Sequence, residues 1–310
     1  FYADGQFTHG CSVDHIIFQF QGDDFELAFD DQEVKRRFEI TQSNAAEFIT
    51  KSRNRIGNHF TPVGVVHGWS PASMARAASE LIKMGYNYLA LGGMVPLRAD
   101  QIKSALDSVR AVIPASTQVH VLGFAKADNI HEFEGSGLSS IDTTSPLLRA
   151  FKDKRANYYS LNDGQIEYFT AIRIPQSLDS TPLKKLVQSG KLELENAVKS
   201  EKQALKELRL FDEGASTIQN TMDAVRSYWS LIKSEEARTN PTKANKEMST
   251  LTSRIIPTLE KMPWKKCTCK ICQAIGVEVV IFRGNNRNRR RGMHNLSVYA
   301  EKIQTLRSEI

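Results

Sequence analysis

The 310-residue sequence has few cysteines and no long apolar run, and both absences narrow the class of protein. Of its four cysteines, three lie within six consecutive positions, so there is no disulfide framework. No apolar stretch approaches the roughly 20 residues that a membrane-spanning helix needs, and no secretory signal opens the chain. We therefore expect a protein of the reducing cytoplasm that does not enter a membrane.

Nucleotide-cofactor motifs are also absent. No G-x-G-x-x-G or Walker loop follows any predicted strand, which argues against a dinucleotide-dependent or ATP-dependent enzyme. Hydrophobic residues make up 41% of the chain and charged residues 25%, which are ordinary values for a globular protein. The length suffices for one large α/β domain with additions, or for two domains.

The first 150 residues alternate apolar runs with amphipathic helical patterns, which is typical of a parallel sheet covered by helices. The predicted strands are Ser12–Phe20, Pro62–His67, Tyr88–Leu91, Val119–Phe124 and Leu138–Ile141. The predicted helices are Ala45–Arg55, Pro71–Met84, Ala99–Val112 and Asn129–Glu134. This spacing suits either a doubly wound sheet or a (β/α)8 barrel.

Polar residues and glycines at the ends of five predicted strands favour the barrel. These positions are Asp14, His67-Gly68, Gly92-Gly93, Gly123 and Asp142. In a barrel such ends converge on one mouth, whereas a doubly wound sheet uses only the strands beside its switch point. We therefore predict an α/β fold of the TIM (β/α)8 type.

The later part of the chain has long, charged amphipathic patterns. Helices are expected at Leu183–Leu210, Ser216–Glu236 and Lys243–Lys261, with lysines and glutamates on a solvated face. A strand at Val277–Phe282 and a closing helix at Ser297–Ile310 follow. The predicted domains are a partial barrel with the active site (1–175), a helical insertion (176–262), and a zinc-binding segment with a basic loop and C-terminal helix (263–310).

The cluster Cys267-x-Cys269-x-x-Cys272, followed by His294, has the densest ligand pattern in the sequence. Three thiolates this close together can surround one tetrahedral Zn²⁺, with the histidine as the fourth ligand. The alternative is three unrelated buried or redox-active thiols. Four protein ligands would fill the coordination shell, so the expected zinc is structural.

Positive charge is concentrated in the same stretch. Residues 265–294 hold eight Lys or Arg and one Glu, a sum of +7 against +6 for the whole chain, so the remainder sums to −1. This concentration indicates a polyanion partner, nucleic acid first, although a solvated arginine loop has the same composition. The candidate contacts are Arg283, Arg287, Arg289, Arg290 and Arg291.

Asp142 ends an apolar strand and precedes the hydroxyl-rich turn Thr143–Ser145. Its carboxylate could be a nucleophile or a base, or it could cap a helix. Asp14 could accept hydrogen bonds from a purine, or it could be a surface ion-pair residue. His67 could contact a ligand or be an ordinary buried histidine, and Gly92-Gly93 could admit a planar base or form a tight turn.

The order of these pieces resembles the tRNA-guanine transglycosylase superfamily. The matching segments are VVHG, LALGG, VLGF, a strand-end aspartate and C-x-C-x-x-C…H, within residues 11–150 and 264–300. CSVDHII, SSIDTTSPLLRAFKD and VVIFRGNNRNRRRGMHN are most similar to its DNA-modifying members, the DpdA type, which insert 7-cyano-7-deazaguanine (preQ0) into DNA. The resemblance implies a zinc-containing TIM barrel that exchanges guanine for a 7-deazaguanine base.

The resemblance also implies residue roles. Asp142 would be the nucleophile that attacks C1′, expels guanine and holds a covalent glycosyl-aspartate until the new base displaces it. Asp14 would bind the purine edge. The other base-binding positions would be His67, Gly68, Gly92, Gly93, Leu122 and Gly123. The zinc ligands would be Cys267, Cys269, Cys272 and His294.

Two features depart from this pattern. The superfamily has a further aspartate that acts as general acid/base, in a motif that Asp4 resembles only loosely. Asp4 lies too near Asp14 to take that role, so this aspartate has no counterpart here. We therefore expect the first barrel strands to be absent from this chain. The helical insertion is also longer than in the tRNA enzymes.

The expected activity is that of a pentosyltransferase that exchanges guanine in DNA. One alternative is the same reaction on tRNA. Another is a noncatalytic, zinc-stabilised subunit that binds nucleic acid. The expected partners are DNA, a preQ0-like base and helper proteins that open the duplex, because a buried guanine must first leave the stack.

Overall fold

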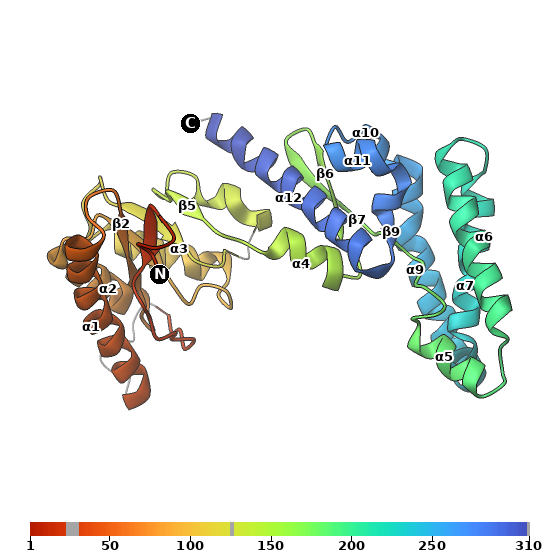
Figure 1. Ribbon diagram of the computed structural model, residues 1–310, viewed down its shortest axis with the longest axis horizontal. Helices are drawn as coiled ribbons and strands as arrows, with labels where there is room; N and C mark the ends of the chain where they lie inside the picture. Colours follow the sequence, from red (N-terminus) through yellow and green to blue (C-terminus); the bar gives the residue numbers. More distant parts are fainter. Residues whose placement is uncertain (23–30, 125–126, 309–310) are drawn as a thin grey trace. The chain divides into compact units, whose positions relative to one another are not determined.

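The computed structural model describes residues 1–22, 31–124 and 127–308, and the chain forms two compact units, Phe1–Ser145 and Pro146–Ile310 (Figure 1). Each unit has a hydrophobic core of its own. The predicted three-part division, with boundaries at 175 and 262, stays a prediction. No helix among the described residues is both long enough and apolar enough to cross a membrane.

The first unit is built on a parallel sheet whose five strands follow one another in chain order. They are β1 His9–Cys11, β2 Thr61–Val66, β3 Tyr88–Leu91, β4 Gln118–Val121 and β5 Ser140–Ile141. A doubly wound sheet reverses its strand order at a switch point, so the sequential order favours the barrel prediction. The sheet is a curled half-barrel, and the residues that the structure describes do not close it into a ring of eight strands.

Helices cover one face of this sheet. They are α1 Gln32–Arg55, α2 Pro71–Met84 and α3 Ala99–Arg110, with the 3-10 turn η1 Ala127–Phe133 before β5. Alternating side chains of the strands, such as Leu89, Leu91, Val119 and Val121, pack into the core beneath these helices. The strand residues that alternate with these, including Tyr88 and His120, therefore point to the opposite face of the sheet.

The ends of α2 illustrate why the local sequence folds as it does. Ser70 and Ser73 form a reciprocal capping box, and Pro71 occupies the first turn, where a missing N–H costs nothing. Gly85 ends the helix with a φ of 94°, a left-handed conformation that glycine adopts without steric cost. Helix α2 therefore has the bounds that its sequence predicts.

Two predictions for the first unit are wrong. No strand forms over Ser12–Phe20, because β1 ends at Cys11 and the apolar residues that follow are irregular and mostly exposed. Helix α1 begins at Gln32, 13 residues before the predicted start at Ala45. The carboxylate of Asp31 caps it by accepting hydrogen bonds from the N–H groups of Glu33 and Val34.

The second unit combines short strands with many helices. It contains the antiparallel hairpin β6 Tyr158–Asn162 and β7 Gln165–Phe169, and the parallel pair β8 Ile172–Arg173 and β9 Ile281–Phe282. The helices up to the metal cluster are α4 Ser145–Lys152, α5 Thr181–Gln188, α6 Leu194–Asp212, α7 Ile218–Ile232, α8 Ser234–Thr239 and α9 Pro241–Lys261. The cluster region adds α10 Pro263–Lys266, α11 Lys270–Ile275, the 3-10 turn η2 Gly276–Val280 and α12 Gly284–Ser308.

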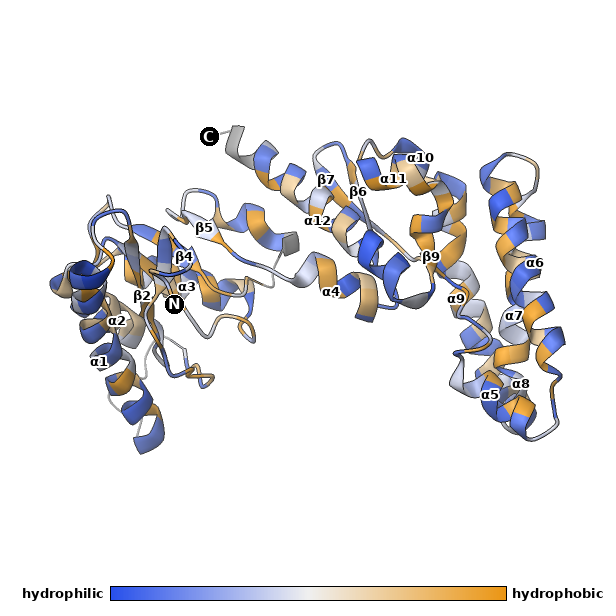
Figure 2. Cartoon of the chain, viewed as in Figure 1, coloured by the Kyte–Doolittle hydropathy of each residue, from blue (hydrophilic) through white to orange (hydrophobic). Residues whose placement is uncertain are grey.

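The expected helices of this region are present, but several bounds differ. Leu183–Leu210 is two helices, because Gly190 adopts a φ of 69° between α5 and α6. Most of the predicted strand Val277–Phe282 is the 3-10 turn η2. The closing helix begins at Gly284, so the predicted basic loop is in fact the start of α12. Figure 2 shows blue and orange residues interleaved along α6 and α7, as expected for amphipathic helices.

Candidate active site and metal centre

Asp14 and His67 lie together beyond the ends of β1 and β2. The Nε2 atom of His67 is 2.6 Å from Oδ2 of Asp14. The hydrogen bond from His67 lowers the pKa of Asp14, although partial burial opposes this shift. The imidazole is buried, whereas the Asp14 side chain keeps 30% of its exposure. The pair therefore presents a carboxylate to solvent on a buried support.

Gly92 and Gly93 follow β3 and pack against the same histidine. A Cβ atom at Gly92 would lie 2.4 Å from Nε2 of His67. At Gly93 the φ is 76°, and a Cβ atom would lie 2.8 Å from the carbonyl oxygen of Ile17. Any larger side chain at these positions would displace His67 or the 12–22 segment, so the two glycines shape this site through packing.

Gly68 and Leu122 lie beside the strand ends in different settings. A Cβ atom at Gly68 would come within 2.6 Å of the hydroxyl of Ser73, so this glycine makes room for the start of α2. Leu122 is half-buried and packs, with Cys11, against the apolar residues on the face of the sheet that the helices do not cover.

The carboxylate of Asp142 is held by the end of β4. Its Oδ1 atom accepts a hydrogen bond of 2.8 Å from the N–H of Gly123 and lies 3.1 Å from Nε2 of His120. The side chain is 56% exposed, and within the described chain no hydrogen bond reaches Oδ2. These contacts leave one oxygen open to solvent, and they show no capping of α4 by this carboxylate.

The thiol of Cys11 is affected by the charges of both carboxylates. Burial raises the pKa of its thiol, and the negative charges of Asp14 and Asp142 raise it further. Both aspartates therefore lie close enough to Cys11 for their charges to act on it. The end of the half-barrel thus gathers Asp14, His67, Gly92-Gly93 and Asp142, as the strand-end pattern predicts.

A polar chain behind Asp142 is absent from the sequence-based prediction. The hydroxyl of Tyr88 is 2.5 Å from the hydroxyl of Ser140, which is 2.6 Å from Nδ1 of His120. The alternation of β4 could have indicated this arrangement, because Val119 and Val121 face the helices and His120 must face the other side. His120 and Ser140 are also paired in the register of β4 and β5.

Four predicted metal ligands meet in the second unit. Their ligand atoms all lie within 4.8 Å of one another, and they belong to Cys267, Cys269, Cys272 and His294. The three sulfur atoms lie 3.7, 3.3 and 3.3 Å from Nδ1 of the histidine. A tetrahedral zinc ion with Zn–S of about 2.3 Å and Zn–N of about 2.0 Å would separate sulfur from nitrogen by about 3.5 Å. The cluster could therefore hold one metal ion.

Residues around the cluster orient its donors. Nε2 of His294 donates to the carbonyl oxygen of Tyr159 at 2.7 Å, which leaves Nδ1 facing the sulfur atoms. The ring of Tyr158 stacks on the imidazole with centroids 4.2 Å apart. The N–H of Cys272 points to Sγ of Cys269 at 3.4 Å, at the start of α11. The site is thus pre-shaped by the fold.

The thiol and imidazole pKa values reflect how tightly the four donors are packed. Hydrogen bonds from Cys272 and His294 lower the pKa of Cys267 to about 3, against the opposing effect of burial. Burial alone would lower the pKa of His294, but its hydrogen bonds to Cys267 and Cys269 outweigh that effect and raise it to about 9. A thiolate is the form that binds a metal ion.

The basic run is only partly on the surface, contrary to the predicted loop. Arg291 is fully buried, and its guanidinium donates to the carbonyl oxygens of Val279, Ile281 and Ala150. Arg283 pairs with Glu201, and Arg287 pairs with Glu278. Arg289 and Arg290 are exposed. Much of this positive charge therefore holds the second unit together.

No family model matches the chain. A curated protein from Salmonella montevideo, named DNA-guanine transglycosylase, is 38% identical over 317 aligned positions, which cover 100% of this chain and 71% of that protein. The chain belongs to the tRNA-guanine transglycosylase superfamily. In this superfamily member, the Cys3His cluster could hold one metal ion, and Asp14, His67 and Asp142 lie at the ends of parallel strands of one sheet.

Proposed function

We propose that this superfamily member is a pentosyltransferase that exchanges guanine in DNA for a 7-deazaguanine base such as preQ0. The name of its Salmonella relative supports both guanine and DNA as substrates. The observation that carries the proposal is the carboxylate of Asp142, which has one oxygen held by Gly123 and His120 and the other without a partner in the described chain.

In the first step, Oδ2 of Asp142 attacks C1′ of the target nucleoside. The C1′–N9 bond breaks, its electron pair leaves with N9 of guanine, and a glycosyl ester forms on Asp142. In the second step, the N9 lone pair of the incoming base attacks C1′, and the N9 proton of this base passes through solvent to the guanine anion released in the first step. The ester bond breaks and the carboxylate is restored, so the exchange consumes no water and needs no redox cofactor.

Asp14 and His67 suit recognition of the base. The exposed part of the Asp14 carboxylate can accept hydrogen bonds from the N1–H and 2-amino groups of a guanine-like ring. The hydrogen bond from His67 stabilises the charged form of this carboxylate, which keeps it an acceptor at neutral pH. The glycines at 92 and 93 let His67 pack closely against the end of β3, which holds the histidine in position beside Asp14.

The Cys3His cluster suits a structural Zn²⁺. Four protein donors complete a tetrahedral shell, so a bound zinc ion would contribute folding energy rather than a reactive water. Cys267, Cys269, Cys272 and His294 join three separate parts of the second unit, namely the end of α10, the start of α11 and the middle of α12. Loss of the ion would therefore release α12 from α11.

A trapped intermediate tests the nucleophile. With a guanine-containing DNA oligonucleotide and no incoming base, the protein should form an adduct that survives denaturing electrophoresis. Asp142→Asn should abolish this adduct without loss of folding. Asp163→Asn, a matched change in the exposed hairpin turn, should leave it intact. Equal amounts of adduct with Asp142→Asn would overturn the assignment of this residue.

The proposal also includes helper proteins that open duplex DNA. A single-stranded oligonucleotide makes them unnecessary in this experiment.

A further inference from the structure

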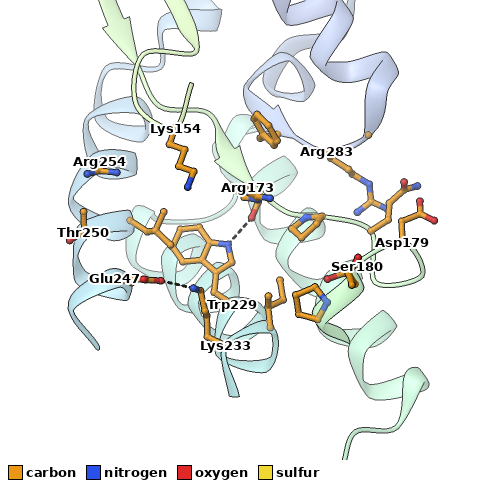
Figure 3. A pocket seen from close by; sticks show the side chains of 18 of the residues that line it. Lys154, Arg173, Asp179, Ser180, Trp229, Lys233, Glu247, Thr250, Arg254 and Arg283 are labelled. Carbon is orange, nitrogen blue, oxygen red and sulfur yellow. Dashed lines mark hydrogen bonds and ion pairs between the residues drawn. The ribbon is translucent and has the colours of Figure 1, made fainter. Parts of the chain in front are cut away.

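A pocket of about 1040 Å³ lies within the second unit, between α5, α7, α9, β8 and the segment that leads into α12 (Figure 3). Seven lysines or arginines line it, against one aspartate and one glutamate. These cations are Lys154, Arg173, Lys233, Lys243, Lys246, Arg254 and Arg283. This basic pocket is separate from the metal cluster, whose ligands do not line it.

Some of these cations already have anionic partners. Lys233 pairs with Glu247 at 2.5 Å and with Glu236 at 2.7 Å, Lys243 pairs with Glu236 at 2.9 Å, and Arg283 pairs with the largely buried Glu201. Within the described ranges, by contrast, no carboxylate forms an ion pair with Lys154, Arg173, Lys246 or Arg254. The pocket therefore has a surplus of positive charge that its own walls do not neutralise.

The cations on α9 form a row along the pocket. Lys243, Lys246 and Arg254 are spaced by three and eight residues, so they share one face of the helix with Thr250. Lys246 and Arg254, the two members of this row without a carboxylate partner in the described chain, are eight residues apart, which is about 12 Å at about 1.5 Å per residue. A nucleic-acid strand carries one phosphate about every 3.4 Å along a helix axis, so the row matches several consecutive phosphates rather than one.

Two aromatic residues, Trp229 and Phe282, help to hold the shape of the pocket. The indole N–H of Trp229 donates to the carbonyl oxygen of Arg173 at 2.6 Å, and Trp229 is only 4% exposed (Figure 3). The guanidinium of Arg173 lies 5.5 Å from the ring centre of Phe282. Arg173 is thus fixed at its backbone and at its side chain, which lowers the entropy lost when it binds a phosphate.

We infer that the basic pocket binds the phosphodiester backbone of a DNA strand, as a second contact with the substrate of the proposed exchange reaction. The inference depends on the proposed function for the identity of the polyanion. A free phosphate or a mononucleotide would use one or two of the cations, whereas the row on α9 and Lys154 on a separate segment serve an extended anion. The helical region of the chain then contributes directly to substrate binding.

A double variant tests this inference. Lys154→Ala combined with Arg254→Ala removes two cations without carboxylate partners in the described chain. Lys202→Ala combined with Lys206→Ala removes the same charge from the exposed face of α6, outside the pocket. The affinity of the full chain for a fluorescent single-stranded oligonucleotide is measured by anisotropy at several salt concentrations. Inorganic phosphate and a guanine mononucleotide serve as competitors, and thermal unfolding confirms that each variant is folded.

The pocket variant should bind at least tenfold more weakly, and its salt slope should fall by about 1.4, because each lost phosphate contact on a single strand contributes about 0.7. The α6 variant should stay within about twofold of the wild type. Equal affinity for both variants would overturn the pocket as a DNA site, as would full displacement of the oligonucleotide by equimolar mononucleotide.

Guanine exchange is assayed in parallel with saturating DNA. A wild-type protein that binds DNA through the pocket but exchanges no base would overturn the proposed function and leave the pocket assignment intact.

Discussion

The imidazole of His120 lies 3.1 Å from the carboxylate of Asp142, and its other nitrogen lies 2.6 Å from the hydroxyl of Ser140. One arrangement of protons satisfies the whole chain: Tyr88 donates to Ser140, Ser140 donates to Nδ1, and Nε2–H donates to Asp142. The histidine then holds one carboxylate oxygen while the other faces solvent. His120 is thereby a positioning residue for the proposed nucleophile.

Removal of this positioning contact should slow the exchange. We expect His120→Ala to lower kcat by about 10-fold to 100-fold, since a hydrogen bond to a charged group contributes about 1.5–3 kcal/mol. KM for DNA should change little, because His120 lies behind the carboxylate. Tyr88→Phe should have a smaller effect. His59→Ala, on an exposed turn, is the control, and an unchanged kcat in His120→Ala would contradict the positioning role.

The Asp14–His67 pair should make stability depend on pH in the acid range. Because the hydrogen bond from His67 lowers the pKa of Asp14 from its usual 3.8, the folded protein binds this proton less readily than the unfolded chain. The stabilisation is present above about pH 5 and is lost as pH falls through the folded pKa. The difference in unfolding free energy between wild type and Asp14→Asn should therefore shrink from pH 6 to pH 3. A constant difference over that range would contradict the pair's contribution.

Metal removal should unfold the second unit. Structural zinc in small sites contributes on the order of 10 kcal/mol, so Cys269→Ser or a strong chelator should lower Tm sharply and expose the region around α11 to protease. Elemental analysis should find one zinc per chain in the wild type. Cys11→Ser removes a thiol outside the cluster and should retain the metal. A metal-free Cys269→Ser protein with wild-type Tm would rule out a structural zinc.

The arginines of α12 should separate into two groups. Arg291→Ala leaves three buried carbonyl groups without their donor, so it should destabilise the fold by about 3 kcal/mol or more. Arg289→Ala with Arg290→Ala should change the unfolding free energy by at most about 0.5 kcal/mol per site, as usual for exposed positions. If the exposed pair contacts DNA, its loss should weaken binding and reduce the salt slope. Chemical denaturation and anisotropy measure the two effects.

Local patterns predicted the elements whose determinants are local. Helix α2 has a cap, an N-terminal proline and a C-terminal glycine, and its bounds agree with the prediction. The hairpin β6–β7 was missed, although Asp163 and Gly164 adopt φ values of 47° and 71°, as the favoured two-residue hairpin turns require. The turn signal Asp163-Gly164 lies between the two strands and could have revealed the hairpin.

Other errors come from tertiary contacts that a single sequence does not display. The basic run has the composition of a solvated loop, but Arg291 is drawn into the core because three carbonyl oxygens and Asn288 satisfy its guanidinium. The strand end at Asp142 was predictable from its apolar run, whereas the support from His120 depends on the register between β4 and β5. The grouping of Cys267, Cys269, Cys272 and His294 was predicted correctly, because the three cysteines are held together by their short spacing in the sequence.

The central claim is base exchange in DNA through Asp142, and label incorporation tests it most directly. Radiolabelled guanine or preQ0 is offered with DNA and with tRNA, side by side, to the wild-type protein, Asp142→Ala and Asp163→Ala. We predict that label enters DNA with the wild type and Asp163→Ala but not with Asp142→Ala. Entry into tRNA alone would contradict the choice of polymer, and undiminished incorporation by Asp142→Ala would contradict the mechanism.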